Sequence, residues 1–258
     1  MRLATYNLTS YVQQAQQDPT AAAELANVQF IAPPPFLVTI PVEATTTSSN
    51  WAGHVANVSN SSTYYQSSAF YNEPQLASSR CSSNSEVSWV GLGGYGRSQL
   101  AQDGTGANTP GLGQHQAWSE ILPDQSTIVP QGLSATANKE FFAETQHLSG
   151  TGSSSKFNFV LVNEYAGLGL NYDVTANGWA GYSTEWIIER PTVNGSYTNL
   201  SNFQTWTVIQ AFGNNANPNK LSGQFPLTMQ SASTGDILAT PSSLSSGGGF
   251  TVTQHDCS

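Results

Sequence analysis

The segment Tyr182-Ser-Thr-Glu-Trp-Ile-Ile-Glu-Arg190 has the composition of a β-strand, because aromatic and β-branched residues dominate it. Successive side chains of a strand point to opposite faces of the sheet. Glu185 and Glu189 therefore share one face, and Trp186 and Ile188 lie on the other. We expect the apolar pair to pack into the core and the two acids to line a polar cleft.

The same pattern continues through the chain from Asn50 onward, where short apolar runs alternate with Gly, Asn and Ser turns and no long amphipathic helix occurs. Ten or more strands at this spacing predict antiparallel sheets in a sandwich or a barrel. The expected strands are Trp51–Val58, Tyr64–Tyr71, Glu86–Leu92, Gln114–Ile121, Glu140–Gln146, Lys156–Asn163, Ser183–Ile188, Gln204–Phe212, Phe225–Met229 and Gly249–Thr253.

Charged residues are scarce. They make up 9% of the 258 residues, against about 25% in an ordinary soluble domain. The 16 acidic residues outnumber the 7 Lys and Arg, which gives a net charge of −9. Acid unfolding is driven largely by protonation of paired carboxylates and by repulsion between the remaining positive charges. A chain with few bases and few ion pairs is therefore suited to an acidic medium.

Composition also excludes several classes of partner. The chain has no basic patch for nucleic acid and no apolar run of the ~20 residues that a membrane span needs. It has no HExxH motif, His/Cys cluster or GxSxG motif, so we expect neither a metal nor a cofactor. Cys81 and Cys257 could form one disulfide in an oxidising compartment. We expect a secreted, extracellular monomer.

Residues 1–48 differ in composition from the rest. Tyr11 to Val28 has helical propensity interrupted by Pro19. Ala32 to Pro35 and Thr45 to Ser49 then resemble a stiff linker followed by a flexible one. We expect residues 1–48 to be the remnant of a pro-segment or an arm, followed by a β-sandwich domain over residues 49–258.

Two glycine-containing segments follow the strand expected at Glu86–Leu92. Gly91 to Gly96 matches GxGxxG, but a dinucleotide site would need a βαβ unit, which the chain lacks. Leu100-Ala-Gln-Asp-Gly-Thr105 is interpreted as an amide-bearing turn. Gln102 in this turn and Glu185 are candidates for a catalytic pair.

A glycoside hydrolase or a carbohydrate-binding protein is the alternative interpretation. Glycosidase carboxylates lie about 5–5.5 Å or 6.5–9.5 Å apart. Glu185 and Glu189 are four strand residues apart, roughly 13 Å, so they cannot form such a pair. Glu120 and Glu185 could form such a pair.

Five segments, in this order, resemble the eqolisins, the glutamic endopeptidases of fungi and their bacterial and archaeal relatives. The resemblance covers residues 49–254. The segments are Ser49-Asn-Trp-Ala-Gly53, Ser88-Trp-Val-Gly-Leu-Gly-Gly94, Leu100-Ala-Gln-Asp-Gly-Thr105, Gln116-Ala-Trp-Ser-Glu-Ile-Leu-Pro123 and Thr184-Glu-Trp-Ile-Ile-Glu189.

The resemblance implies an all-β sandwich of two antiparallel sheets, of the concanavalin A-like lectin and glucanase type, with the active site on the concave sheet. It implies an acid-active endopeptidase on polypeptide substrates, in which Glu185 is the general base and acid and Gln102 stabilises the oxyanion. A pro-segment lost at acid pH is also implied. The substrate-binding residues that it implies are Trp51, Trp89, Trp118 and Glu120. Asp103 departs from the small or neutral residue usual after the glutamine.

Overall fold

The computed structural model describes residues 28–29, 46–60, 63–77, 81, 84–108, 114–124, 129–177 and 181–258. The helical segment expected at Tyr11 to Val28 lies outside the described residues except for its last position, and the proline-rich stretch lies outside them entirely.

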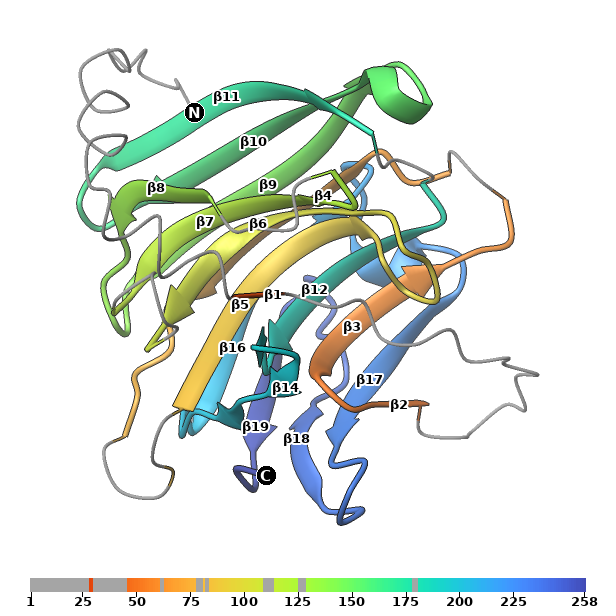
Figure 1. Cartoon of the computed structure of the whole chain (residues 1–258). Coiled ribbons are helices and arrows are strands. Elements are labelled where there is room, and N and C mark those ends of the chain that lie inside the picture. Colours follow the sequence, from red (N-terminus) through yellow and green to blue (C-terminus); the bar gives the residue numbers. More distant parts are fainter. Residues whose placement is uncertain are drawn as a thin grey trace.

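The described residues are almost all β (Figure 1). Seven neighbouring strands, here called the front layer, are β17 (Gln224–Gln230), β3 (Trp51–Asn57), β12 (Ser183–Glu189), β5 (Asn84–Gly93), β6 (Leu100–Ala107), β7 (Gln116–Leu122) and β8 (Val129–Ser134). Seven more, the back layer, are β11 (Leu168–Ala176), β10 (Ser155–Asn163), β9 (Glu140–Ser149), β4 (Gln66–Asn72), β16 (Thr205–Gly213), β19 (Phe250–Gln254) and β18 (Ile237–Pro241).

Shorter elements complete the fold. β2 (Thr46–Ser48) pairs with β17, and β15 (Asn199–Leu200) pairs with β5. A separate small sheet contains β1 (Val28–Gln29), β13 (Thr192–Val193) and β14 (Ser196–Tyr197). The described part of the chain also contains two 3-10 helices, Gly152–Ser154 and Pro218–Lys220.

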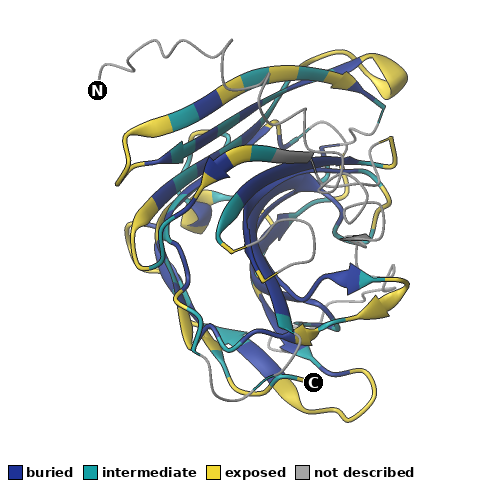
Figure 2. Ribbon diagram, turned by 60° about the vertical axis from the view of Figure 1, so that its left-hand side comes forward, coloured by how far each residue is buried: buried dark blue, intermediate teal, exposed yellow. Residues whose placement is uncertain are grey.

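The two layers pack face to face as a sandwich. Strand pairing runs unbroken from one layer to the other through β18 and β17. Hydrogen bonds then cross between the layers: the Trp186 indole donates to the Ser68 carbonyl at 3.0 Å, and the Ser67 hydroxyl donates to the Glu185 carbonyl at 3.0 Å. Figure 2 shows the buried strands of the front layer curving through the middle of the molecule. The predicted all-β sandwich is confirmed.

The main core lies between the layers. Trp186 and Ile188 of β12 belong to it, with Tyr71 and Trp206 from the back layer. Ile187, the residue between them, belongs to a different cluster on the opposite face of the front layer. This alternation is the one predicted for the segment 182–190.

Several strands differ from the sequence prediction. Leu100–Ala107 is the strand β6 and not a turn, and β8, β11 and β18 were not predicted. Every residue of β6 is buried, so its sequence shows no alternation of polar and apolar residues. Thr46–Ser48, expected within a flexible linker, pairs with β17 instead.

Cys81 and Cys257 form a disulfide with 5.9 Å between their Cα atoms. It ties the segment before β5 to the C-terminal end of the chain. Among the described residues, no helix has both the length and the apolar character to cross a membrane.

Candidate active site

Glu185 and Gln102 lie in one transverse row of the front layer. Glu185 of β12 is paired with Gly91 of β5, Gly91 with Gln102 of β6, and Gln102 with Glu120 of β7. Directly paired residues point to the same face of a sheet. Three of these four residues carry polar side chains on the face turned away from the main core, here called the outer face. The fourth is a glycine between Glu185 and Gln102.

Three tryptophans lie in the two rows on one side of this row. Trp89 is paired with Ile187 and Gly104, and Gly104 is paired with Trp118, so these residues occupy the next row on the outer face. The ring centroids of Trp51 and Trp89 are 4.8 Å apart, with the planes at 78°. All three tryptophans are buried in one cluster, which makes the surroundings of the polar row apolar.

The indole of Trp89 lies over Gly91. A Cβ atom added at Gly91 would be 2.8 Å from Cζ3 of Trp89, closer than real side chains approach. The absence of a side chain at Gly91 therefore leaves room for the indole. As a result the ring lies in the floor between the carboxyl of Glu185 and the amide of Gln102.

Glu120 holds the amide of Gln102. Nε2 of Gln102 donates a hydrogen bond to the Glu120 carboxyl at 2.8 Å. Oε1 of Gln102 is buried and has no hydrogen-bond partner among the described residues. Burial raises the pKa of Glu120 to about 8, although the hydrogen bond from Gln102 opposes the rise. At acid pH the carboxyl of Glu120 is therefore neutral.

Glu185 is buried with little compensation. Neither carboxyl oxygen has a hydrogen bond of regular geometry among the described residues. Burial raises the pKa of Glu185 well above its usual value, and the nearby Ser183 hydroxyl and Tyr95 amide offset only part of this effect. The neutral form of Glu185 is therefore favoured in this structure.

Glu189, at the other end of β12, accepts hydrogen bonds on both carboxyl oxygens. The donors are Nδ2 of Asn50 at 3.0 Å and Nε1 of Trp89 at 2.9 Å. Burial raises the pKa of Glu189 well above its usual value. Glu189 is thus connected to the polar row through the indole of Trp89.

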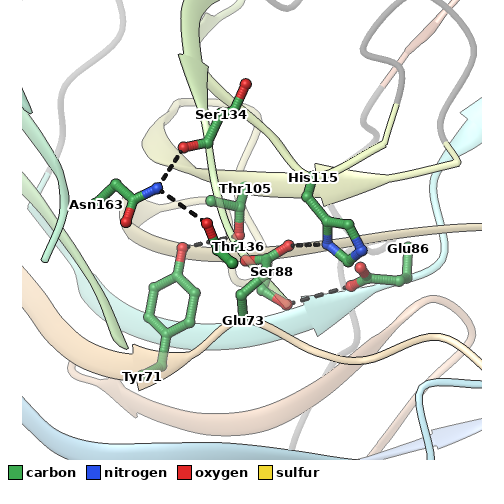
Figure 3. A network of polar contacts seen from close by, with 9 residues as sticks. All are labelled: Tyr71, Glu73, Glu86, Ser88, Thr105, His115, Ser134, Thr136 and Asn163. Atoms are coloured by element: carbon green, nitrogen blue, oxygen red, sulfur yellow. Dashed lines mark hydrogen bonds and ion pairs between the residues drawn. The ribbon is translucent and has the colours of Figure 1, made fainter. Parts of the chain in front are cut away.

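Asp103 points away from this site. Its neighbour Gln102 faces outward, so Asp103 faces the space between the layers, where Thr145 of β9 donates to its carboxyl at 2.8 Å. A second polar network also lies on this inner side (Figure 3). In it His115 contacts Glu73 at 2.9 Å, and Ser88 donates to Glu86 at 3.2 Å.

The structure brings together the residues that the sequence analysis selected. Glu185, Gln102 and Glu120 share one row, and the three tryptophans lie on the same face. A role for the tryptophans and Glu120 in substrate binding stays a prediction. The described residues contain no group of three or more His, Cys, Asp or Glu that could hold a metal.

Sequence reasoning missed two features of the site. Gly91 was placed in the expected strand Glu86–Leu92 and considered only as part of a GxGxxG match, but in β5 it makes room for the indole. Its position two residues after Trp89 on the same strand face was the available signal. Glu189 was considered only as a partner for Glu185, and nothing in the sequence shows that it contacts Trp89.

Known proteins resemble this chain in sequence family and in fold. The sequence profile of the Peptidase A4 family matches residues 49–254. Scytalido-glutamic peptidase bound to a peptide-based transition-state analogue is 18% identical, with a TM-score of 0.61 over 80% of this chain and 98% of that one. SCP-B, an eqolisin peptidase in complex with the tripeptide Ala-Ile-His, is 14% identical, with a TM-score of 0.55 over the same shares of both chains. No curated protein matches the chain.

Proposed function

Because the chain belongs to the Peptidase A4 family, the eqolisins, and is a glutamic endopeptidase, we propose that Glu185 and Gln102 form its catalytic dyad. One observation carries this assignment. The two side chains lie on the same face in one row, with only Gly91 between them. No other carboxyl and amide of the five motifs have this relation.

In the proposed reaction, ionised Glu185 removes a proton from a water molecule that also contacts Gln102. The water oxygen attacks the scissile carbonyl carbon, and the carbonyl oxygen becomes an oxyanion. The Nε2 hydrogen of Gln102 that does not point to Glu120 donates to this oxyanion, a contribution of about 3–4 kcal/mol. Glu185 then gives its proton to the departing amine as the C–N bond breaks.

Glu120 supports this step by fixing the amide of Gln102. Its carboxyl accepts one Nε2 hydrogen at 2.8 Å, and this contact restrains the amide while leaving the second Nε2 hydrogen available to the reacting carbonyl. The sequence analysis also expected Glu120 to contact substrate. Such a contact would be made on the same outer face, next to Gln102.

The ionised base requires a site that is open to water. Burial is the main reason that the pKa of Glu185 is raised, and a protonated Glu185 cannot act as a base. β1 pairs with β13, which follows β12 in the chain. We propose that residues 1–48 are a pro-segment, that the dyad is open to water in the mature, secreted enzyme, and that this enzyme acts at acid pH.

A glycoside hydrolase with Glu185 and Glu120 as its acid pair is not favoured by this arrangement. Two strands separate the strands that carry them, so their backbones are about 14 Å apart. The side chains point the same way and not across a sugar ring. The match to a peptidase family over most of the chain agrees with this conclusion.

The test follows hydrolysis of an unfolded protein substrate at about pH 4, where a carboxylate base is still partly ionised. The full chain is incubated at this pH, and mass spectrometry follows its N-terminus. We expect cleavage near residue 48 and peptidase activity to appear together, and Glu185→Gln to show neither. A parent chain that is processed but cleaves no polypeptide would contradict the proposal, and glycan substrates would then be assayed.

A further inference from the structure

Among the described residues, Glu189 is the buried acid on the outer face of the front layer that the proposed reaction does not use. Its two oxygens accept hydrogen bonds from Trp89 and Asn50, at 2.9 and 3.0 Å. A buried polar group of this kind is expensive to leave without partners. The two contacts therefore fix the positions of both donors as well as that of the carboxyl.

The donor from Trp89 matters because of where the rest of its ring lies. The six-membered part of the indole covers Gly91, with Cζ3 and Cε3 closest to the position of a built Cβ atom. Gly91 is paired with Glu185 on one side and with Gln102 on the other. The end of the ring opposite the nitrogen is thus the surface between the two members of the dyad.

Two contacts restrain the orientation of this ring. Trp51 packs against it edge to face at 4.8 Å, an apolar contact that does not by itself hold the nitrogen end of the ring against rotation about the side-chain bonds. The hydrogen bond from Nε1 to Glu189 opposes that rotation, because it fixes the nitrogen end of the ring. Small displacements of groups around a reacting centre can lower a rate by ~10²-fold per ångström.

We propose that Glu189 is a positioning residue that acts through Trp89, holding the indole in the floor between Glu185 and Gln102. This inference rests on the proposed dyad. It gives Glu189 a function in the reaction even though its carboxyl does not touch substrate. The competing explanation is purely structural: Glu189 would only tie Asn50, at the turn before β3, to the end of β12.

Two substitutions separate these explanations. Glu189→Gln keeps the size of the side chain but replaces one acceptor with an NH₂ group, which faces a donor from either Trp89 or Asn50. Trp89→Phe removes the N–H donor and keeps an aromatic ring. The matched control is Trp206→Phe, the same chemical change at a buried tryptophan of the back layer, far from the dyad in the sheet order.

The kinetic experiment measures kcat and KM with a peptide substrate at about pH 4 for the parent, both variants and the double variant. We expect each single variant to lower kcat by at least ~10-fold with little change in KM. The double variant should be no slower than the slower single variant, since both act through one ring. Trp206→Phe should keep the kcat of the parent.

Three outcomes would overturn the proposal: a folded Glu189→Gln variant with the kcat of the parent, two effects that multiply in the double variant, or a loss confined to the thermal midpoint. If Glu189→Gln does not fold, the Trp89→Phe variant tests the proposal. An unchanged kcat in that variant contradicts a role in catalysis for the hydrogen bond between Trp89 and Glu189.

A spectroscopic measurement tests the contact independently of activity. The close pair Trp51 and Trp89 should give an exciton couplet in the far-ultraviolet circular dichroism spectrum. Loss of the couplet in Trp89→Phe assigns it to this pair. We expect Glu189→Gln to weaken this couplet, and an unchanged couplet would overturn the proposal. A parent that cleaves no polypeptide contradicts the dyad instead, and the couplet still reports on the contact.

Discussion

At the scale of single residues, the site depends on a position with no side chain. Glu185 and Gln102 are on strands that are not neighbours, so a residue of β5 must lie between them. That residue is Gly91, and the indole of Trp89 covers it. Any larger residue would displace the indole and change the space in which a scissile bond must fit.

Gly91→Ala should therefore lower kcat by about 10-fold or more, since its methyl group would be 2.8 Å from the Trp89 ring. We also expect a loss of about 1–3 kcal/mol in the free energy of unfolding, which is typical of overpacking. Steady-state kinetics and urea denaturation measure the two effects. The control is Gly247→Ala, where the nearest atom is 3.8 Å away. Full activity in Gly91→Ala would mean that the indole does not need its present position.

At the scale of elements, β6 shows where sequence reasoning succeeded and where it failed. The motif of residues 100–105 selected Gln102, which the structure places in one row with Glu185, but the segment was interpreted as a turn, and Gly104 and Asp103 are typical turn residues. Gly104 is needed because an added Cβ would be 2.0 Å from the Ser88 carbonyl. Asp103 is tolerated because it bonds to Thr145 in the other layer. Both reasons lie in tertiary packing.

β12 was predicted well for a related reason. Its two faces meet different surroundings, so Trp186 and Ile188 contrast with Glu185 and Glu189 in the sequence itself. The register that aligns Glu185, Gly91, Gln102 and Glu120 could not be predicted, because strand order depends on contacts between distant segments. The resemblance to a family identified Glu185 and Gln102 as candidates. The strand register across β12, β5 and β6 explains why they lie in one row.

Asp103 gives a prediction for the interface between the layers. Burial raises its pKa well above the usual value. The protonated form is therefore favoured in the folded state, and the stability it contributes is lost as the pH rises through the folded pKa. Asp103→Asn keeps an acceptor for Thr145 and cannot ionise. Denaturant unfolding should give the variant nearly the same free energy of unfolding as the parent at a pH below the usual pKa of aspartate. At neutral pH the variant should have the larger free energy of unfolding.

The matched control is Asp173→Asn on the exposed strand β11. There Lys156 and Asn158 lower the pKa of the carboxyl, so its ionised form stabilises the folded state. This substitution should cause a small loss of stability at neutral pH and none in strong acid. If Asp103→Asn also lost stability at neutral pH, the carboxyl of Asp103 would not be neutral in the fold.

At the scale of the whole molecule, buried carboxyl groups are the dominant electrostatic feature. Glu86, Asp103, Glu120, Glu185 and Glu189 are all buried, and burial is the largest cause of the raised pKa of each. Only two ion pairs occur among the described residues, one of which requires a protonated histidine. The fold is therefore arranged for protonated rather than paired acids.

Thermal stability should consequently be highest in acid and fall as the pH rises toward and past neutrality. For Glu120 the pKa is raised from 4.5 to about 8, so stability present below 4.5 is lost between these values. At about 1.4 kcal/mol per unit, this residue alone accounts for ~5 kcal/mol over that window. Calorimetry across this range measures the trend. A melting temperature that rises from acid to neutral pH would contradict the account.

The measurement that addresses the catalytic dyad most directly is a double-mutant cycle on peptide hydrolysis at about pH 4. It compares kcat for the processed parent, Glu185→Gln, Gln102→Ala and the double variant, each shown to be folded by circular dichroism. The account predicts a loss of ~10²–10³-fold for Gln102→Ala, an undetectable rate for Glu185→Gln, and no further loss in the double variant. A folded Glu185→Gln variant that cleaves the peptide at the rate of the parent would contradict it.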